Sequence, residues 1–319
     1  MKLKLLVGLG VVVAVVVHLG TAPVLAGLHA LSPTTLTAAL ALGLLTTTAS
    51  AARWTAVARG LDLPITLPTA VADCYRAQFL NSVLPAGVLG DVHRALDHGR
   101  RSHDLTRGAH AVLLERLAGQ AVVIAVSLTG LALLPSPLHG LLTDLTDHLP
   151  ALVTAAALTT AVLLGLAGLP RLRNTLTRLA AGTRAGLLTT RTGPPVLALS
   201  LVAMAGHLAL LALAATAVGV HTDPTRLLPL LLLSLLAMGL PLNIGGWGPR
   251  EAATATGFGL AGLGATTGLA TAVAFGVLAL ISTLPGLGVL VLRRTAQHRT
   301  AASTNSERST FRARRASVA

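Results

Sequence analysis

Hydrophobic residues form long runs along this chain, and charged residues are concentrated in the segments between the runs. Six runs predict helices that cross the roughly 30 Å hydrocarbon core of a bilayer. They cover residues 5–19, 36–52, 109–134, 149–169, 195–218 and 264–292. The pattern therefore predicts an all-α, polytopic membrane bundle with about six full spans.

Two further apolar stretches are interrupted near their middle. Residues 70–95 are broken by LPAG at 84–87, and residues 227–263 are broken by LPLNIGGWGP at 240–249. The final arm, residues 251–263, would be only about 20 Å long as a helix, which is too short to span. We predict that both stretches form re-entrant helical hairpins with broken tips.

The order span, span, hairpin, span occurs twice, over residues 1–135 and 149–292. The second half starts from the opposite side, so the order indicates an inverted repeat. Broken helices at matching positions of two inverted halves point to a substrate site near the membrane midplane. We expect one membrane domain, residues 1–292, followed by a disordered basic tail, residues 293–319, which lacks apolar periodicity.

The charges of the connecting segments orient this arrangement. Residues 171–191 carry five Arg and no acid, whereas residues 135–148 carry two Asp and no Lys or Arg. The positive-inside rule places the first segment in the cytoplasm and the second outside. Residues 53–107, both N-terminal Lys residues and the tail then lie inside, so both termini are cytoplasmic. Topology thus accounts for the net charge of +13 in a plasma-membrane protein, without nucleic acid as a partner.

Two local interpretations depend on this topology. The N-terminus resembles a cleaved signal peptide ending at Val24-Leu25-Ala26, but a retained first helix fits the charge pattern better. Aromatic residues make up only 2% of the chain, so Trp54, beside Arg53, and Trp247 are the candidate anchors at the membrane interface.

Charged groups inside apolar stretches are costly and usually mark function. Asn81, Asp91 and Arg94 flank the first break, and a spacing of three places Asp91 and Arg94 on one helix face, where they can pair. Glu115 and Arg116 lie within the span that starts near residue 109. The functional interpretation is a polar lining that meets a lipid headgroup. The alternative is that these side chains snorkel to water at the membrane interface.

The second break carries Asn243, Gly246 and Gly248 before Arg250 and Glu251. The glycines allow the backbone to approach a ligand closely. Amide groups at the start of the following helix favour an anion, and Arg250 adds a charge-assisted contact to a phosphate. The alternative is an Arg250–Glu251 pair that satisfies the helix end.

Other chemistry is not indicated by the sequence. The single cysteine, Cys74, excludes an internal disulfide. No GxxxxGK[ST] nucleotide motif occurs, and the His and Asp residues after the first hairpin match no HExxH-like metal pattern. His207, near the middle of its span, is interpreted as a neutral, hydrogen-bonded side chain rather than a proton carrier. We therefore predict no metal, no cofactor and no catalytic residue.

The segments FLNSVLPAGVLGDVHR, VLLERLAG, LPLNIGGWGPREAA and STLPGLG, in this order, resemble the lysylphosphatidylglycerol synthase transmembrane-region family, also called the flippase-like domain family. The resemblance covers most of residues 5–292. Family members usually show Gly-Gly-Asp where this chain has Leu89-Gly90-Asp91, and we expect no aminoacyl-transferase domain after residue 292. The resemblance implies that the signature positions are Asn81, Pro85, Gly90, Asp91, Arg94, Glu115, Arg116, Gly246, Gly248, Arg250 and Glu251.

In bifunctional members this domain is linked to moving aminoacylated phosphatidylglycerol to the outer leaflet. The resemblance therefore implies a translocase for a lipid with an anionic phosphate headgroup, either lysylphosphatidylglycerol-like or polyprenyl-phosphate-linked. Membrane lipids and a separate lipid-modifying transferase are the candidate partners. Two alternatives stay open: an enzyme that uses Asp91 or Glu115 as acid or base on a lipid-linked substrate, and a non-transporting partner subunit.

Overall fold

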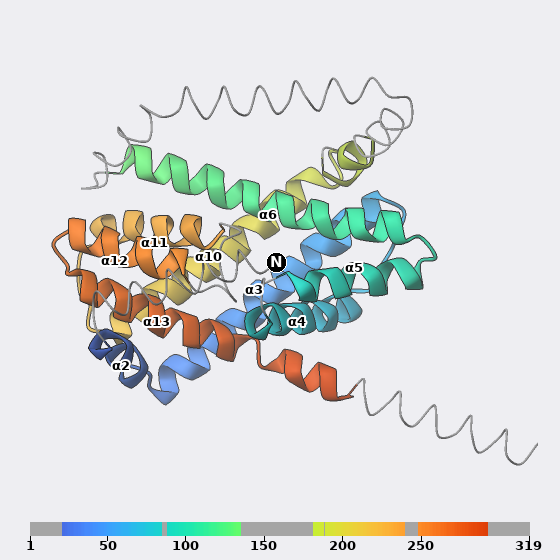
Figure 1. Cartoon of the computed structure of the whole chain (residues 1–319). Coiled ribbons are helices and arrows are strands. Elements are labelled where there is room, and N and C mark those ends of the chain that lie inside the picture. The colour runs from blue at the N-terminus through green and yellow to red at the C-terminus, as the bar shows by residue number, and fades with distance from the viewer. Residues whose placement is uncertain (1–20, 85–87, 135–180, 188, 240–247, 293–319) are drawn as a thin grey trace, which may run out of the picture.

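The computed structural model describes residues 21–84, 88–134, 181–187, 189–239 and 248–292. Within them the regular elements are all helices (Figure 1). The labelled helices are α2 (Ala22–His29), α3 (Pro33–Gly60), α4 (Leu67–Val83), α5 (Leu89–Arg101), α6 (Leu105–Leu133), α10 (Gly193–Ala217), α11 (Pro224–Met238), α12 (Pro249–Leu260) and α13 (Ala265–Ser282). Residues 181–187 and 285–292 are also helical.

Four helices are long and apolar enough to cross a membrane, namely α3, α6, α10 and the segment Ala265–Leu292 that begins with α13. They coincide with four predicted spans, so a multi-pass, all-helical membrane protein is confirmed for the described part of the chain. The predicted spans at 5–19 and 149–169, and the tail 293–319, lie outside the described residues.

The helix α3 corrects one predicted boundary. It begins behind a capping box, in which the Ser32 hydroxyl accepts from the Thr35 amide and the Thr35 hydroxyl accepts from the Ser32 amide. It then continues to Gly60, eight residues past the predicted end at residue 52. The charge of Arg53 suggested the end of a span, but arginine is a good helix former. Residues 53–60 therefore belong to the helix, and their side of the membrane stays a prediction.

Both predicted hairpins form antiparallel helix pairs. In the first, the Asn81 side chain of α4 accepts from the Gly90 amide of α5 at 2.8 Å, and Arg76 donates to Asp97 at 2.6 Å. Partner numbers fall on α4 as they rise on α5, so the two helices run in opposite directions. In the second, the Ser234 hydroxyl of α11 lies 2.8 Å from the Thr254 hydroxyl of α12. The depth to which these pairs enter the membrane stays a prediction.

The two halves share their order and their contacts. In Figure 1 the α4–α5 pair and the α11–α12 pair lie at opposite ends, with α3, α10 and α13 between them. Helix α5 packs on α6 as α12 packs on α13, and α3 packs on α13 as α10 packs on α6. If α3, α4, α5 and α6 are matched in order with α10, α11, α12 and α13, each of these contacts has a counterpart in the other half, as a structural repeat requires. The predicted inversion across the membrane, and the halves as domains, are not tested by these contacts.

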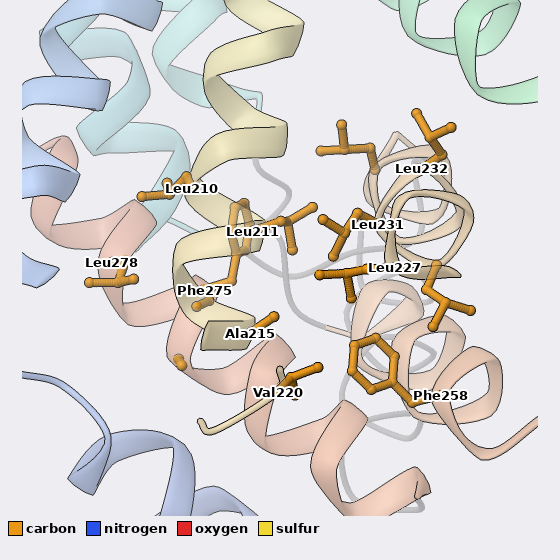
Figure 2. Packing of buried hydrophobic residues seen from close by; sticks show 14 of the residues in the cluster. Leu210, Leu211, Ala215, Val220, Leu227, Leu231, Leu232, Phe258, Phe275 and Leu278 are labelled. Atoms are coloured by element: carbon orange, nitrogen blue, oxygen red, sulfur yellow. The ribbon is translucent and has the colours of Figure 1, made fainter. Parts of the chain in front are cut away.

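The core and the outer surface are both apolar. Figure 2 shows part of the larger core, in which Leu211 of α10, Leu231 of α11, Phe258 of α12 and Phe275 of α13 are buried together. By contrast, only 28% to 39% of the apolar window of each candidate span is buried. Helices that are hydrophobic all round and still exposed are typical of membrane spans, whose outer face meets lipid.

Small residues let the spans approach closely. A Cβ on Gly43 of α3 would lie 2.5 Å from the Cβ of Ser282 on α13. A Cβ on Gly206 of α10 would overlap the Thr46 side chain of α3. Such close backbone approach is typical of helix packing in membranes, where burial of apolar surface does not drive association.

Candidate functional site

A buried carboxylate on α6 joins arginines from two other helices. Glu115 is 2% exposed, and its Oε1 accepts from Arg53 of α3 at 2.5 Å and 3.1 Å. Its Oε2 accepts from Arg94 of α5 at 2.6 Å. Arg53 also donates to the Ser200 hydroxyl of α10 at 3.1 Å. These charge-assisted hydrogen bonds connect four helices at one buried point.

The network continues through Asp91 to the cavity rim. Arg94 Nη2 lies 3.2 Å from Asp91 Oδ1, so the predicted pairing of these two residues is present. Asp91 Oδ2 accepts from the Asn81 amide at 2.7 Å and from the Arg116 guanidinium. The result is an alternating row of three arginines and two carboxylates, in the order Arg53, Glu115, Arg94, Asp91, Arg116.

Arg94 also contacts an aromatic ring and a thiol. Its guanidinium lies 4.6 Å from the centre of the Trp54 ring, and its Nη1 donates to Cys74 Sγ at 3.0 Å. The Trp54 side chain is fully buried, so the expectation that it anchors the membrane interface is wrong. Its ring instead supplies a cation–π contact inside the bundle.

Two glycines of the signature motifs have structural reasons in this fold. A Cβ on Gly119, one turn after Glu115, would lie 2.8 Å from a guanidinium nitrogen of Arg53, so Gly119 leaves the space that Arg53 fills. A Cβ on Gly90 would overlap the backbone carbonyl of Ala77. Gly90 therefore serves the close contact of α5 with α4.

The charged pair at the start of α12 is local. Gly248 caps this helix with φ at 118°, a conformation that favours glycine. Its amide donates to Glu251 Oε2 at 2.6 Å, while Arg250 Nε donates to Glu251 Oε1 at 3.0 Å. The Arg250 guanidinium lies 4.9 Å from the centre of the Phe275 ring. The pair that the alternative interpretation expects is thus present, and Glu251 accepts from the Gly248 amide. A contact of Arg250 with a phosphate stays a prediction.

One cavity of about 380 Å³ connects the two charged groups. Its walls come from α3, α4, α5 and α6 of the first half and from α10, α11, α12 and α13 of the second half. The predicted site residues in these walls are Asn81, Asp91, Arg94, Glu115, Arg116 and Arg250. Gly248 and Glu251 do not line the cavity, and Glu251 accepts from both Arg250 and the Gly248 amide. Asn243 and Gly246 lie outside the described residues.

Comparison with known proteins agrees with this architecture. Residues 1–286 match the family described as the lysylphosphatidylglycerol synthase TM region. The chain belongs to this family. The match extends over both halves, so the resemblance seen in the sequence motifs is confirmed. A search of curated proteins and a search of solved structures each found no match.

In this member of the lysylphosphatidylglycerol synthase TM-region family, burial distinguishes charged residues that form a polar lining from charged residues that snorkel to water. Arg94 and Glu115 are 3% and 2% exposed, so they do not snorkel to water. The Arg116 side chain is 50% exposed, so it meets the surroundings directly while it contacts Asp91. Arg116 is therefore the accessible end of the charged row.

Sequence reasoning missed two members of the site, Arg53 and Ser200. Arg53 was assigned to a cytoplasmic connection because its charge ended the apolar run. The available signal was the absence of any Gly or Pro between residues 44 and 59, which allows one helix to run through Arg53. Ser200 carries no comparable signal, because serine is common in membrane helices.

The histidines of the described residues do not form a metal site. His207 lines the cavity, and its Nδ1 lies 2.7 Å from the carbonyl of Ala203, as the hydrogen-bonded interpretation expects. Among the described residues no three His, Cys, Asp or Glu side chains gather as metal ligands would.

Proposed function

We propose that this protein translocates a lipid with an anionic phosphate headgroup across the plasma membrane. The cavity shared by both halves carries the proposal. Its volume of about 380 Å³ lies in the range of small-molecule sites, and four arginines line it, Arg53, Arg94, Arg116 and Arg250. Membership in a membrane family named for a lipid synthase agrees with lipid handling.

The lining suits an amphiphile. The cavity is lined by arginines and by amides such as Gln78 and Gln120, together with apolar side chains such as Leu210 and Leu280. In the proposed mechanism the phosphate contacts the arginines, and the acyl or prenyl chains stay in the bilayer. Rocking of one half against the other around the shared cavity would expose the headgroup to each side in turn.

The enzyme alternative fits the site less well. It requires Asp91 or Glu115 to exchange a proton with substrate. Both oxygens of Glu115 accept from arginines, and Asp91 lies between Arg94 and Arg116. Arginines therefore occupy the carboxylate oxygens that an acid or base would have to present to a substrate.

Lipid movement in proteoliposomes tests the proposal. Fluorescent phosphatidylglycerol in the inner leaflet should become accessible to an impermeant quencher faster with the wild type than in empty vesicles. The double variant Arg250→Ala/Glu251→Ala removes the second charged pair as a unit, and it should lose most of this acceleration. Arg107→Ala is the matched control, because Arg107 is exposed and does not line the cavity.

One outcome would contradict the assigned site, and two would contradict translocation itself. The wild-type rate in the double variant would remove the second charged pair from the transport site. Turnover of a lipid-linked substrate by the purified protein in detergent would favour the enzyme. Co-purification with a transferase, with no lipid movement by the protein alone, would favour the partner subunit.

A further inference from the structure

We infer that the cavity contains a second, uncharged subsite, formed by Thr46, His207 and Ser282, which binds a hydrogen-bond donor that the headgroup carries besides its phosphate. This inference rests on the proposed function and adds to it a subsite apart from the arginines. The donor is a hydroxyl group, as in a glycerol or sugar headgroup, or an ammonium group, as in an aminoacylated one. Both kinds of group offer a hydrogen to the same acceptors.

Helices α3 and α10 place the subsite two helical turns from the charged row. Arg53 of α3 donates to Ser200 of α10, and seven residues before Arg53 the Thr46 side chain lies where a Cβ on Gly206 of α10 would be. The two helices are therefore antiparallel, and Thr46 lies about 10 Å from Arg53 along the α3 axis. His207 directly follows Gly206, and both Thr46 and His207 line the cavity.

Helix α13 supplies the third member of the subsite. Ser282 also lines the cavity, and a Cβ on Gly43, one turn before Thr46, would lie 2.5 Å from the Ser282 Cβ. The second charged group is two turns away on this helix, because Arg250 contacts the ring of Phe275, seven residues before Ser282. The subsite therefore joins uncharged side chains from three helices.

The hydrogens of these side chains are already used within their own helices. The Thr46 and Ser282 hydroxyls each donate to the carbonyl oxygen three residues earlier, at 3.2 Å and 2.6 Å. Nδ1 of His207 lies 2.7 Å from the carbonyl oxygen of Ala203. A carbonyl oxygen can only accept, so each of the three side chains provides the hydrogen of its bond.

The atoms left for a ligand are therefore acceptors. A hydroxyl oxygen keeps its lone pairs when its hydrogen is used, and a neutral imidazole that is protonated at Nδ1 has its lone pair on Nε2. An ionised phosphate offers these atoms only further lone pairs, whereas a hydroxyl or ammonium group offers them a hydrogen. The phosphate is thus expected at the arginines and the donor at Thr46, His207 and Ser282.

Thr46→Val removes one acceptor and keeps the shape of the side chain, including the methyl group that lies against Gly206. Thr55→Val is the matched control on the same helix. Both threonines are 9% exposed, and both hydroxyls donate to the carbonyl three residues earlier, but Thr55 does not line the cavity. Thr46→Ser keeps the hydroxyl and tests whether the oxygen itself is required.

The measurement compares three fluorescent lipids with the same acyl chains in the inner leaflet of proteoliposomes. They are phosphatidylmethanol, whose ionised headgroup has no donor, phosphatidylglycerol, which has hydroxyl groups, and its lysyl ester, which adds ammonium groups. The wild type should move at least one donor-bearing lipid about tenfold faster than phosphatidylmethanol, which corresponds to about 1.4 kcal/mol.

Thr46→Val should reduce this advantage about fivefold, the size of one hydrogen bond, and should leave phosphatidylmethanol at its wild-type rate. Thr46→Ser and Thr55→Val should keep the advantage. A preference that already holds for phosphatidylglycerol identifies a hydroxyl as sufficient, and a preference for the lysyl ester alone identifies the ammonium; both results support the subsite.

The other outcomes separate the inference from the proposed function. Equal rates for the three lipids in the wild type, equal slowing of all three in Thr46→Val, or the same loss of preference in Thr55→Val would overturn the inference and leave lipid translocation standing. No movement of any of the lipids by folded wild-type protein would overturn both.

Discussion

The charged groups of the two helix pairs differ in how they are assembled. The Glu115 network joins residues that are 62 and 21 positions apart in the chain, from α3, α5 and α6. The Arg250–Glu251 pair joins neighbours at the start of one helix, and its further partners include Gly248, three residues from Glu251. Both groups are buried, so the difference lies in connectivity and not in exposure.

This difference indicates different roles in the bundle. The Arg250–Glu251 ion pair itself joins two residues of one helix end, and Arg250 contacts α13 through the Phe275 ring. Breaking the Glu115 network leaves two buried arginines from separate helices without their shared carboxylate. We therefore expect the first half to depend strongly on its charges for stability, and the second half to depend on them less.

Glu115→Gln should have the largest effect. Removal of one partner from a buried ion pair costs about 3–5 kcal/mol of stability, and here Arg53 and Arg94 both lose their carboxylate. Thermal unfolding in detergent measures the loss. The chain's one cysteine, Cys74, is buried against Arg94, so its rate of maleimide labelling reports whether the network itself opens.

A second variant makes this prediction specific. Arg53→Leu in the Glu115→Gln background removes one of the two arginines that have lost their carboxylate. The double variant should therefore lose less stability than the sum of the losses in the two single variants. Strictly additive losses, or unchanged Cys74 labelling in Glu115→Gln, would show that the network does not act as a unit.

Glu251→Gln should have an intermediate effect. The amide oxygen of glutamine can still accept from the Gly248 amide, so the expected loss is about 1.5–3 kcal/mol, the range for a hydrogen bond to a charged group. Labelling of Cys74 should stay close to the wild-type rate, because Cys74 contacts the other charged group. If Glu251→Gln destabilised the protein as much as Glu115→Gln, the contrast between local and distributed pairing would fail.

Asp223→Ala should have the smallest effect, because this carboxylate is fully exposed before α11. Asp223 accepts from the Thr225 amide at 2.8 Å and from the Thr225 hydroxyl at 2.7 Å, and these hydrogen bonds lower the pKa of Asp223. A carboxyl group whose pKa is lowered by folding stabilises the protein above its unfolded pKa, about 3.9. The stabilisation is lost as the pH falls through the lower pKa of the folded protein.

The difference in melting temperature between Asp223→Ala and wild type should therefore be present at pH 7 and should shrink in acid below pH 3.9. A difference that is constant with pH would show that the carboxylate charge does not contribute to this cap.

Among the described residues, the sequence alone was sufficient for four apolar spans, for the two helix pairs and for their order. In a bilayer, the backbone N–H and C=O groups of a long apolar run must be hydrogen-bonded within the protein, and a helix does this within the run itself. The breaks at residues 84–87 and 240–249 divided two runs into helix pairs. Local spacing also placed Asp91 beside Arg94 and Arg250 beside Glu251. These features depend on neighbours within about one helical turn, which a sequence pattern records directly.

Only the tertiary structure decided which distant charges meet. The selection of Glu115 as the shared partner of Arg53 and Arg94 depends on how closely three helices approach, and hence on space left by Gly90 and Gly119. Helical periodicity gives the face on which a residue lies, but not the helix that faces it. For this reason the sequence pattern ended the span before Arg53, whereas packing buries Arg53 at the point where four helices join.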